Sequence, residues 1–164
     1  MTKDRRRAFR YSLYGIIGTT LFWGVMHVHA APDTKQRTHR ERGEQYLTAG
    51  KYPEAVIELR NAVQLNPKDA QAYYLLAMAY FKQEKPDLLQ QAYYYLIKCV
   101  EIDPDVLDAQ LLLGEMYLGA EQFDKALQHA TQMLRTDPAN VEAHILAGWI
   151  YAGKGFYGQA IEAI

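Results

Sequence analysis

Few residues beyond the first thirty have the type and spacing that enzymatic chemistry needs. The three histidines in this part, His39, His129 and His144, have no second histidine or cysteine at metal-ligand spacing. The single cysteine, Cys99, can form neither an intramolecular disulfide nor a thiolate metal site, and we expect it to be a small buried side chain. The turn Gly153-Lys154-Gly155 lacks the spacing of a phosphate-binding loop. The sequence therefore predicts no enzymatic activity, no cofactor and no metal.

The charge of the chain is divided unevenly. The 18 Lys and Arg residues nearly balance the 19 Asp and Glu residues, but five of the basic and only one of the acidic residues fall within residues 1–30. Residues 31–164 therefore carry 13 basic and 18 acidic residues, a net charge of −5. Because binding to nucleic acid phosphates needs a basic face, we expect a partner other than nucleic acid.

Residues 1–30 have the pattern of a signal peptide. A basic start is followed by residues 11–28, which contain no Asp, Glu, Lys or Arg, and Val28 and Ala30 fit the small-x-small pattern for cleavage after Ala30. An uncharged run of this length also approaches a membrane span, so the alternative is an uncleaved anchor through residues 11–28. Either interpretation predicts a periplasmic or otherwise extracytoplasmic location, the second with the repeats held outside at the inner membrane.

The remaining residues repeat with a period of 34. The repeated tyrosines are spaced 34, 37 and 34 residues apart, and the repeated alanines 37, 34 and 34. These residues are Tyr46, Tyr80, Tyr117 and Tyr151, and Ala55, Ala92, Ala126 and Ala160. Both series place one three-residue insertion between Tyr80 and Ala92. Three residues are slightly less than one helical turn, so we expect one helix of the second unit to be longer.

Each unit reads as a pair of antiparallel helices. Apolar residues recur at helical spacing in both halves of the third unit, and Asp137-Pro138 ends its second helix because the residue before proline avoids the α region. Asp69 and Asn140 are placed to cap the helices that follow them. Small residues stand where the two helices cross, and we expect Gly114 to lie beneath Ala126. The unit predicts an all-α fold.

The 34-residue period with Gly/Ala, Tyr, Ala and Pro at fixed positions resembles the tetratricopeptide repeat family. The resemblance implies a right-handed α-solenoid over residues 36–164 after a linker at 31–35, with repeats at 36–69, 70–106, 107–140 and 141–164, the last one incomplete. Residues 50–80 after a signal peptide also resemble the exported bacterial repeat proteins of exopolysaccharide and exosortase-type systems.

The family geometry implies a concave groove lined by the first helix of each repeat. The groove would bind a protein or peptide segment through apolar and aromatic side chains, with a polar patch at the N-terminal end. The implied residues are Arg40, Glu44, Tyr74, Met78, Phe81, Leu111, Glu115, Leu118, Ile145 and Trp149. The alternative for several of them is packing against the neighbouring repeat. Glu44 stands where the carboxylate-clamp subfamily has asparagine, so we do not expect that type of recognition.

The expected function is a non-enzymatic protein-interaction scaffold outside the cytoplasm, in envelope assembly, secretion or exopolysaccharide export. One alternative is a structural or self-assembling spacer, a homo-oligomer, which the run Tyr93-Tyr94-Tyr95 and an open C-terminal end would favour. Another is the N-terminal scaffold of a longer protein whose activity lies in a C-terminal region, since Ile161 and Ile164 would otherwise face solvent.

Overall fold

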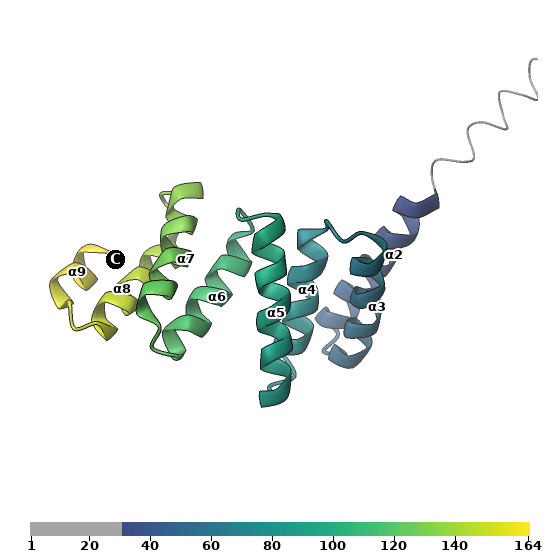
Figure 1. Ribbon diagram of the computed structural model, residues 1–164, viewed down its shortest axis with the longest axis horizontal. Helices are drawn as coiled ribbons and strands as arrows, with labels where there is room; N and C mark the ends of the chain where they lie inside the picture. The colour runs from purple at the N-terminus through teal and green to yellow at the C-terminus, as the bar shows by residue number, and fades with distance from the viewer. Residues whose placement is uncertain (1–30) are drawn as a thin grey trace, which may run out of the picture.

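The computed structural model describes residues 31–164, with side chains from residue 35 (Figure 1). All regular secondary structure in these residues is helical. The helices are α2 (Ala31–Thr48), α3 (Tyr52–Leu65), α4 (Ala70–Phe81), α5 (Pro86–Ile102), α6 (Leu107–Gly119), α7 (Phe123–Thr136), α8 (Val141–Gly153) and α9 (Tyr157–Glu162). They follow one another in chain order along the long axis, from α2 to α9. The predicted signal peptide and membrane span lie outside the described residues.

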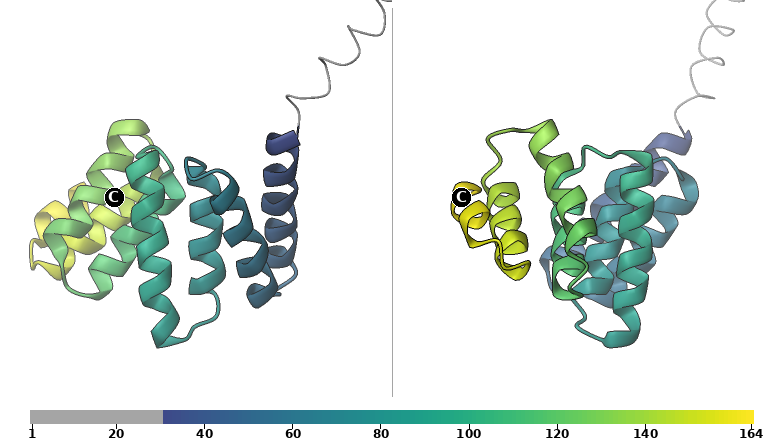
Figure 2. Two further views of the ribbon diagram at one scale, coloured as in Figure 1. Left: turned by 45° about the vertical axis from the view of Figure 1, so that its right-hand side comes forward. Right: turned by 60° about the vertical axis from the view of Figure 1, so that its left-hand side comes forward.

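The helices pack as consecutive pairs joined by short turns: α2 with α3, α4 with α5, α6 with α7, and α8 with α9 (Figure 2). The core runs through the whole stack. Its largest fully buried side chains are Leu59, Leu76, Leu96, Leu113, Met133, Ile150 and Cys99. The predicted all-α stack of helix pairs is confirmed.

The helix boundaries follow from capping and proline. Asp69 accepts a hydrogen bond from the Ala72 amide at 3.0 Å, and Asn140 accepts one from the Ala143 amide at 2.8 Å, so both predicted caps are confirmed. Helix α5 has 17 residues, whereas α3 and α7 have 14 each. The three additional residues precede Ala92, which confirms that the insertion in the second unit lengthens one helix.

The sequence places a linker at residues 31–35, before the first repeat. Helix α2 begins at Ala31, so these residues are helical.

The expected placement of Gly114 beneath Ala126 needs correction. A Cβ atom built on Gly114 would lie 2.5 Å from Cδ2 of Leu146 and 3.5 Å from Cβ of His129. Gly114 therefore makes room for Leu146 of α8, in the next pair, as well as for α7. Ala126 is fully buried in the same region, in a cluster with Leu146 and Ile150.

The last pair leaves large apolar side chains in solvent. Ile161 and Ile164 are each 79% exposed, as the sequence predicts, and Trp149 is 64% exposed. Over residues 31–164 the structure has no helix with both the length and the apolar character needed to cross a membrane.

Candidate functional site

A pocket between α4 and α6 collects half of the predicted groove residues. It has a volume of about 210 Å³. Its lining comes from two helices: Tyr74, Met78, Phe81 and Lys82 from α4 and its C-cap, and Asp108, Leu111, Leu112 and Glu115 from α6. We call these eight residues the α4–α6 pocket. Five of the predicted residues, Tyr74, Met78, Phe81, Leu111 and Glu115, therefore lie together.

The pocket forms because α4 and α6 stand further apart than the other first helices of consecutive pairs. The backbones of α2 and α4 approach closely, and so do those of α6 and α8. The register position of Gly114 in α6 is taken by Ala77 in α4, and Ala77 is fully buried. Ala77 belongs to the buried cluster that also contains Leu112 and Leu113 of α6, whereas Gly114 leaves space for Leu146 at the next junction.

The walls of the pocket are anchored in the core. Tyr74, Met78 and Phe81 pack on the buried cluster that contains Leu112 and Leu113, and each remains partly exposed. One side of each of these residues therefore packs against the neighbouring repeat, as the alternative interpretation predicts. The other side lines the pocket. The pocket is therefore lined by side chains that are already packed on the core.

Tyr74 carries the phenol of the pocket. Burial, together with the negative charge of Asp108, raises the pKa of Tyr74 to about 12. The hydroxyl is therefore neutral at physiological pH. It can donate a hydrogen bond to a partner from the edge of an otherwise apolar wall.

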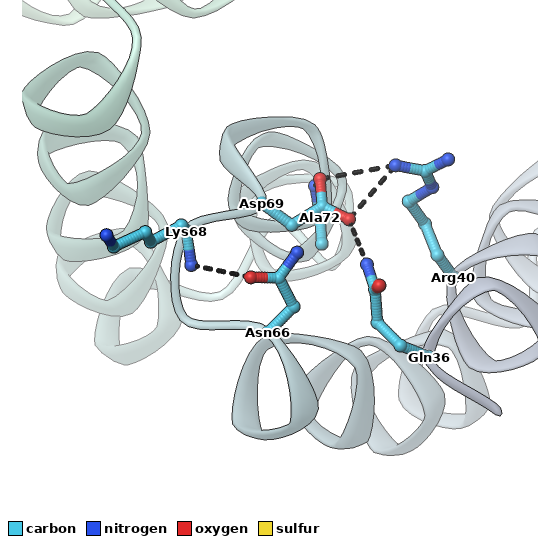
Figure 3. A network of polar contacts seen from close by, with 6 residues as sticks. All are labelled: Gln36, Arg40, Asn66, Lys68, Asp69 and Ala72. Atoms are coloured by element: carbon cyan, nitrogen blue, oxygen red, sulfur yellow. Dashed lines mark hydrogen bonds and ion pairs between the residues drawn. The ribbon is translucent and has the colours of Figure 1, made fainter. Parts of the chain in front are cut away.

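Arg40 lies in a different environment, at the joint between the first two pairs (Figure 3). Its Nη1 donates to both carboxylate oxygens of Asp69, at 3.2 and 3.0 Å, and Gln36 donates to Asp69 as well. Asp69 also caps α4, so one buried carboxylate holds α2 to the start of α4. This joint borders a polar hollow of about 580 Å³. The ion pair gives Arg40 a structural role, in addition to the role in partner binding that the sequence predicts.

The other four predicted residues are not part of the α4–α6 pocket. Glu44 lies exposed on α2, on the rim of a hollow formed by that helix. Leu118 packs on the cluster around Ala126 and is partly buried. Ile145 and Trp149 are exposed on α8, at the register positions of Leu111 and Glu115.

Polar residues at the fourth position of three repeats, His39, Gln110 and His144, make hydrogen bonds that sequence reasoning missed, and we call these residues the fourth-position column. His39 Nδ1 lies 2.5 Å from Oε2 of Glu58, and Nδ1 of His129 lies 2.6 Å from Oε1 of Gln110. In both pairs the residues are 19 apart in the chain. His144 makes the third such contact, from its Nδ1 to the carbonyl oxygen of Ala163 at 2.9 Å. The signal available in the sequence was a polar residue followed 19 positions later by a second polar residue, as in His39 with Glu58.

These hydrogen bonds explain the histidines without catalysis. Each of the three makes its hydrogen bond to the other helix of its own pair or to the residue that ends that helix. Cys99 is fully buried as predicted, and burial raises the pKa of its thiol to about 12, which keeps it protonated and unreactive. Within residues 31–164 no three His, Cys, Asp or Glu side chains gather into a group that could hold a metal ion.

Helix pairs stacked in register around a continuous core define an α-solenoid repeat protein. Comparison with family models identifies the repeat. Two models described as tetratricopeptide repeat match residues 70–106 and 111–164, and one described as TPR repeat matches residues 43–84. These segments of the chain belong to the tetratricopeptide repeat family. Proteins of this family are protein-interaction scaffolds.

Curated relatives match over the repeats. Hsp70-Hsp90 organizing protein 1 of Glycine max is 36% identical over 104 residues, which are 63% of this chain and 18% of that protein. The BBSome complex member BBS4 of Bos taurus is 28% identical over 116 residues, 71% of this chain and 22% of its own length. The chain thus spans about a fifth of the length of these relatives.

Solved structures share the architecture. A crystal structure of MamA protein superposes with a TM-score of 0.69 at 26% identity, over 81% of this chain and 71% of that one. Pseudomonas aeruginosa pilF superposes with a TM-score of 0.68 at 20% identity, over 80% of this chain and 59% of that chain. The second likeness shows the fold alone.

Proposed function

We propose that the protein is a non-enzymatic scaffold that binds a segment of another protein along the face formed by α2, α4, α6 and α8. The observation that carries the proposal is the α4–α6 pocket, where Tyr74, Met78 and Phe81 face Leu111 across two consecutive repeats. Partly buried aromatic and aliphatic side chains in a preformed pocket are the features of interface anchor sites. Relatives named as an Hsp70-Hsp90 organizing protein and as a member of the BBSome complex match this chain over its repeats, which supports the proposal.

A phage-displayed random peptide library tests this proposal. The full-length chain is immobilised, and the recovered peptides are measured for binding to wild type and to the double variant Tyr74→Ala with Leu111→Glu. We expect the variant to lose at least about tenfold in affinity, because a truncated anchor typically costs more than about 1 kcal/mol. The matched control is Ile57→Glu with Tyr94→Ala, the same changes at exposed positions on α3 and α5, and it should bind as wild type does.

Folding and binding are separated in the same experiment. Each variant is compared with wild type by helicity and by thermal midpoint before its affinity is interpreted. Trp149→Ala is a second groove variant whose side chain is 64% exposed and is therefore safe for the fold. The proposal fails if no peptide is recovered, or if the control variant and the groove variants bind alike.

The proposal includes a location outside the cytoplasm, in envelope assembly, secretion or exopolysaccharide export. It rests on residues 1–30, with their basic start, the uncharged run at 11–28 and the small residues before Ala31. Mass spectrometry of the protein from the envelope fraction should find Ala31 as the first residue. Met1 at the N-terminus would favour the anchor, and protection from protease added to spheroplasts would refute the external location.

Self-assembly is a second candidate, favoured by the exposed apolar side chains of α9. The tyrosine run gives it less support than the sequence predicts. The ring of Tyr95 stacks on Tyr80 at a centroid distance of 5.6 Å, and the hydroxyl of Tyr93 lies 2.5 Å from that of Tyr117. Tyr94 alone of the three is exposed, so the run is largely occupied within the protein.

A further inference from the structure

The α4–α6 pocket is lined by more negative than positive groups, and these groups form no ion pairs within the described residues. Asp108 and Glu115 stand on the α6 side and Lys82 on the α4 side. All three are exposed, and within the described residues neither Asp108 nor Glu115 makes an ion pair. The pocket therefore offers two free carboxylates against one free ammonium group.

The two carboxylates lie along one side of the apolar floor. Both are on α6, seven residues apart, which is about two helical turns, with Leu111 and Leu112 between them in the chain. Lys82 follows the last residue of α4, at the far end of the pocket from the start of α6. Tyr74 lies within the electrostatic reach of Asp108: its pKa is raised first by burial and then by the negative charge of Asp108.

The neighbouring helices continue the negative character. At the register position of Glu115, α2 has Glu44, and at that of Asp108, α8 has Glu142, and both are exposed. Two basic residues of α2, Arg37 and Arg40, stand in register with the pocket, and Arg40 is paired with Asp69. Exposed Arg37 on α2 is the exception to this pattern.

The size of the pocket limits its occupant. About 210 Å³ is less than the roughly 300–1,000 Å³ of small-molecule sites, so a single side chain suits it better than a whole small molecule. Phe81, Met78 and Leu111 offer that side chain an apolar environment, and the carboxylates beside them attract a cation.

We propose that the α4–α6 pocket takes one apolar side chain of a basic protein segment, whose neighbouring lysine or arginine pairs with Asp108 and Glu115. This inference rests on the proposed function, and it adds the chemistry of the partner. Charge complementarity of this kind selects among partners and speeds their encounter more than it strengthens binding. An acidic segment is disfavoured because it would face two like charges.

The library experiment tests this inference separately from the scaffold function. We expect the peptides recovered on wild type to have a lysine or arginine within three residues of a leucine, methionine or phenylalanine. The best of them should bind Asp108→Asn with Glu115→Gln about two- to thirtyfold more weakly than wild type, since each of the two exposed pairs is worth about 0.2–1 kcal/mol. The difference should shrink in 1 M salt, which screens exposed charges.

The matched control removes the same charges elsewhere. Glu54→Gln with Asp87→Asn changes first-turn acids on α3 and α5, away from the pocket, and Asp108 is likewise a first-turn acid. This control should bind the basic peptide as wild type does. Peptides that are neutral or acidic, or a control that weakens binding as much as the pocket variant, would overturn the basic partner and leave the scaffold function standing. If the library yields no binding peptide at all, both the scaffold function and the basic partner are refuted.

Discussion

At the scale of single residues, the fourth-position column shows how polar groups can replace a large aromatic in a repeat core. Gln110 is only 4% exposed, yet each end of its amide has a partner. Its Nε2 donates to the carbonyl oxygen of Pro104 at 2.7 Å, so its Oε1 is the acceptor that faces His129. His129 must then donate from Nδ1, which fixes the proton of the neutral imidazole there.

The pH dependence of stability should reveal this histidine. Burial lowers the pKa of His129 in the folded state, so the unfolded chain binds a proton first as the pH falls. The free energy of unfolding should therefore be highest above about pH 6.5, the ordinary value, and decrease below it. In His129→Gln this decrease should be smaller. Urea unfolding of both proteins from pH 5 to pH 8 measures it, and equal slopes would contradict the assignment.

The roles of residues were predictable where they depend on a single helix. They were missed where they depend on contacts between two helices. The caps Asp69 and Asn140 follow from their position before a helical run. The hydrogen bonds of His39 and Gln110 were missed because their partners, Glu58 and His129, lie on another helix. The ion pair of Arg40 with Asp69 depends on how α2 packs on α4, which no local pattern states.

At the scale of helices, Gly114 controls how closely the third pair meets the fourth. Leu146 of α8 fills the space that a side chain on Gly114 would need. Gly114→Ala should cost about 1–3 kcal/mol of folding stability through overpacking. Denaturant unfolding measures the change. Gly119→Ala is the control on the same helix, because no heavy atom lies within 4 Å of its Cβ position. This control should be neutral or stabilising by at most about 1 kcal/mol.

A double-mutant cycle identifies the partner of Gly114. Leu146→Ala alone should cost about 2–5 kcal/mol, as for other buried leucines. In that background the Cδ2 atom is absent, so Gly114→Ala should cost less than it does in wild type. If the two costs add to within about 0.5 kcal/mol, the residues are not in contact.

The helices themselves were predictable because period, prolines and capping residues act locally. The longer α5 follows directly from the 37-residue spacing. The separation of α4 from α6 was not predictable, because it depends on how side chains from different helices pack together, which no local pattern states. The pocket results from that separation. The sequence therefore predicts residues that would line a groove, but it does not predict where along the groove a pocket lies.

At the scale of the whole molecule, the two ends of the described stack differ. The large side chains exposed on α9 and just after it are Tyr157, Ile161 and Ile164, of which the two isoleucines are each 79% exposed. The first helix, α2, is dominated by charged and amide side chains. Contact between an apolar end and a polar end buries apolar surface on only one of the two partners, so head-to-tail stacking of two copies is disfavoured. A symmetric contact, in which two α9 faces bury each other, suits the distribution better.

We therefore expect the chain, at micromolar concentration and above, to form a dimer through α9. Sedimentation velocity in a single detergent buffer measures the mass of wild type and of Tyr157→Glu with Ile161→Glu. The variant should sediment as a monomer at every concentration, because two carboxylates buried without partners cost more than the contact gains. Ile57→Glu, an exposed isoleucine on α3, is the control and should dimerise like wild type. Dimers of the α9 variant would place self-association elsewhere on the molecule. A monomeric wild type would remove the self-assembling spacer as a candidate and leave the exposed end without a role in pairing copies of this chain.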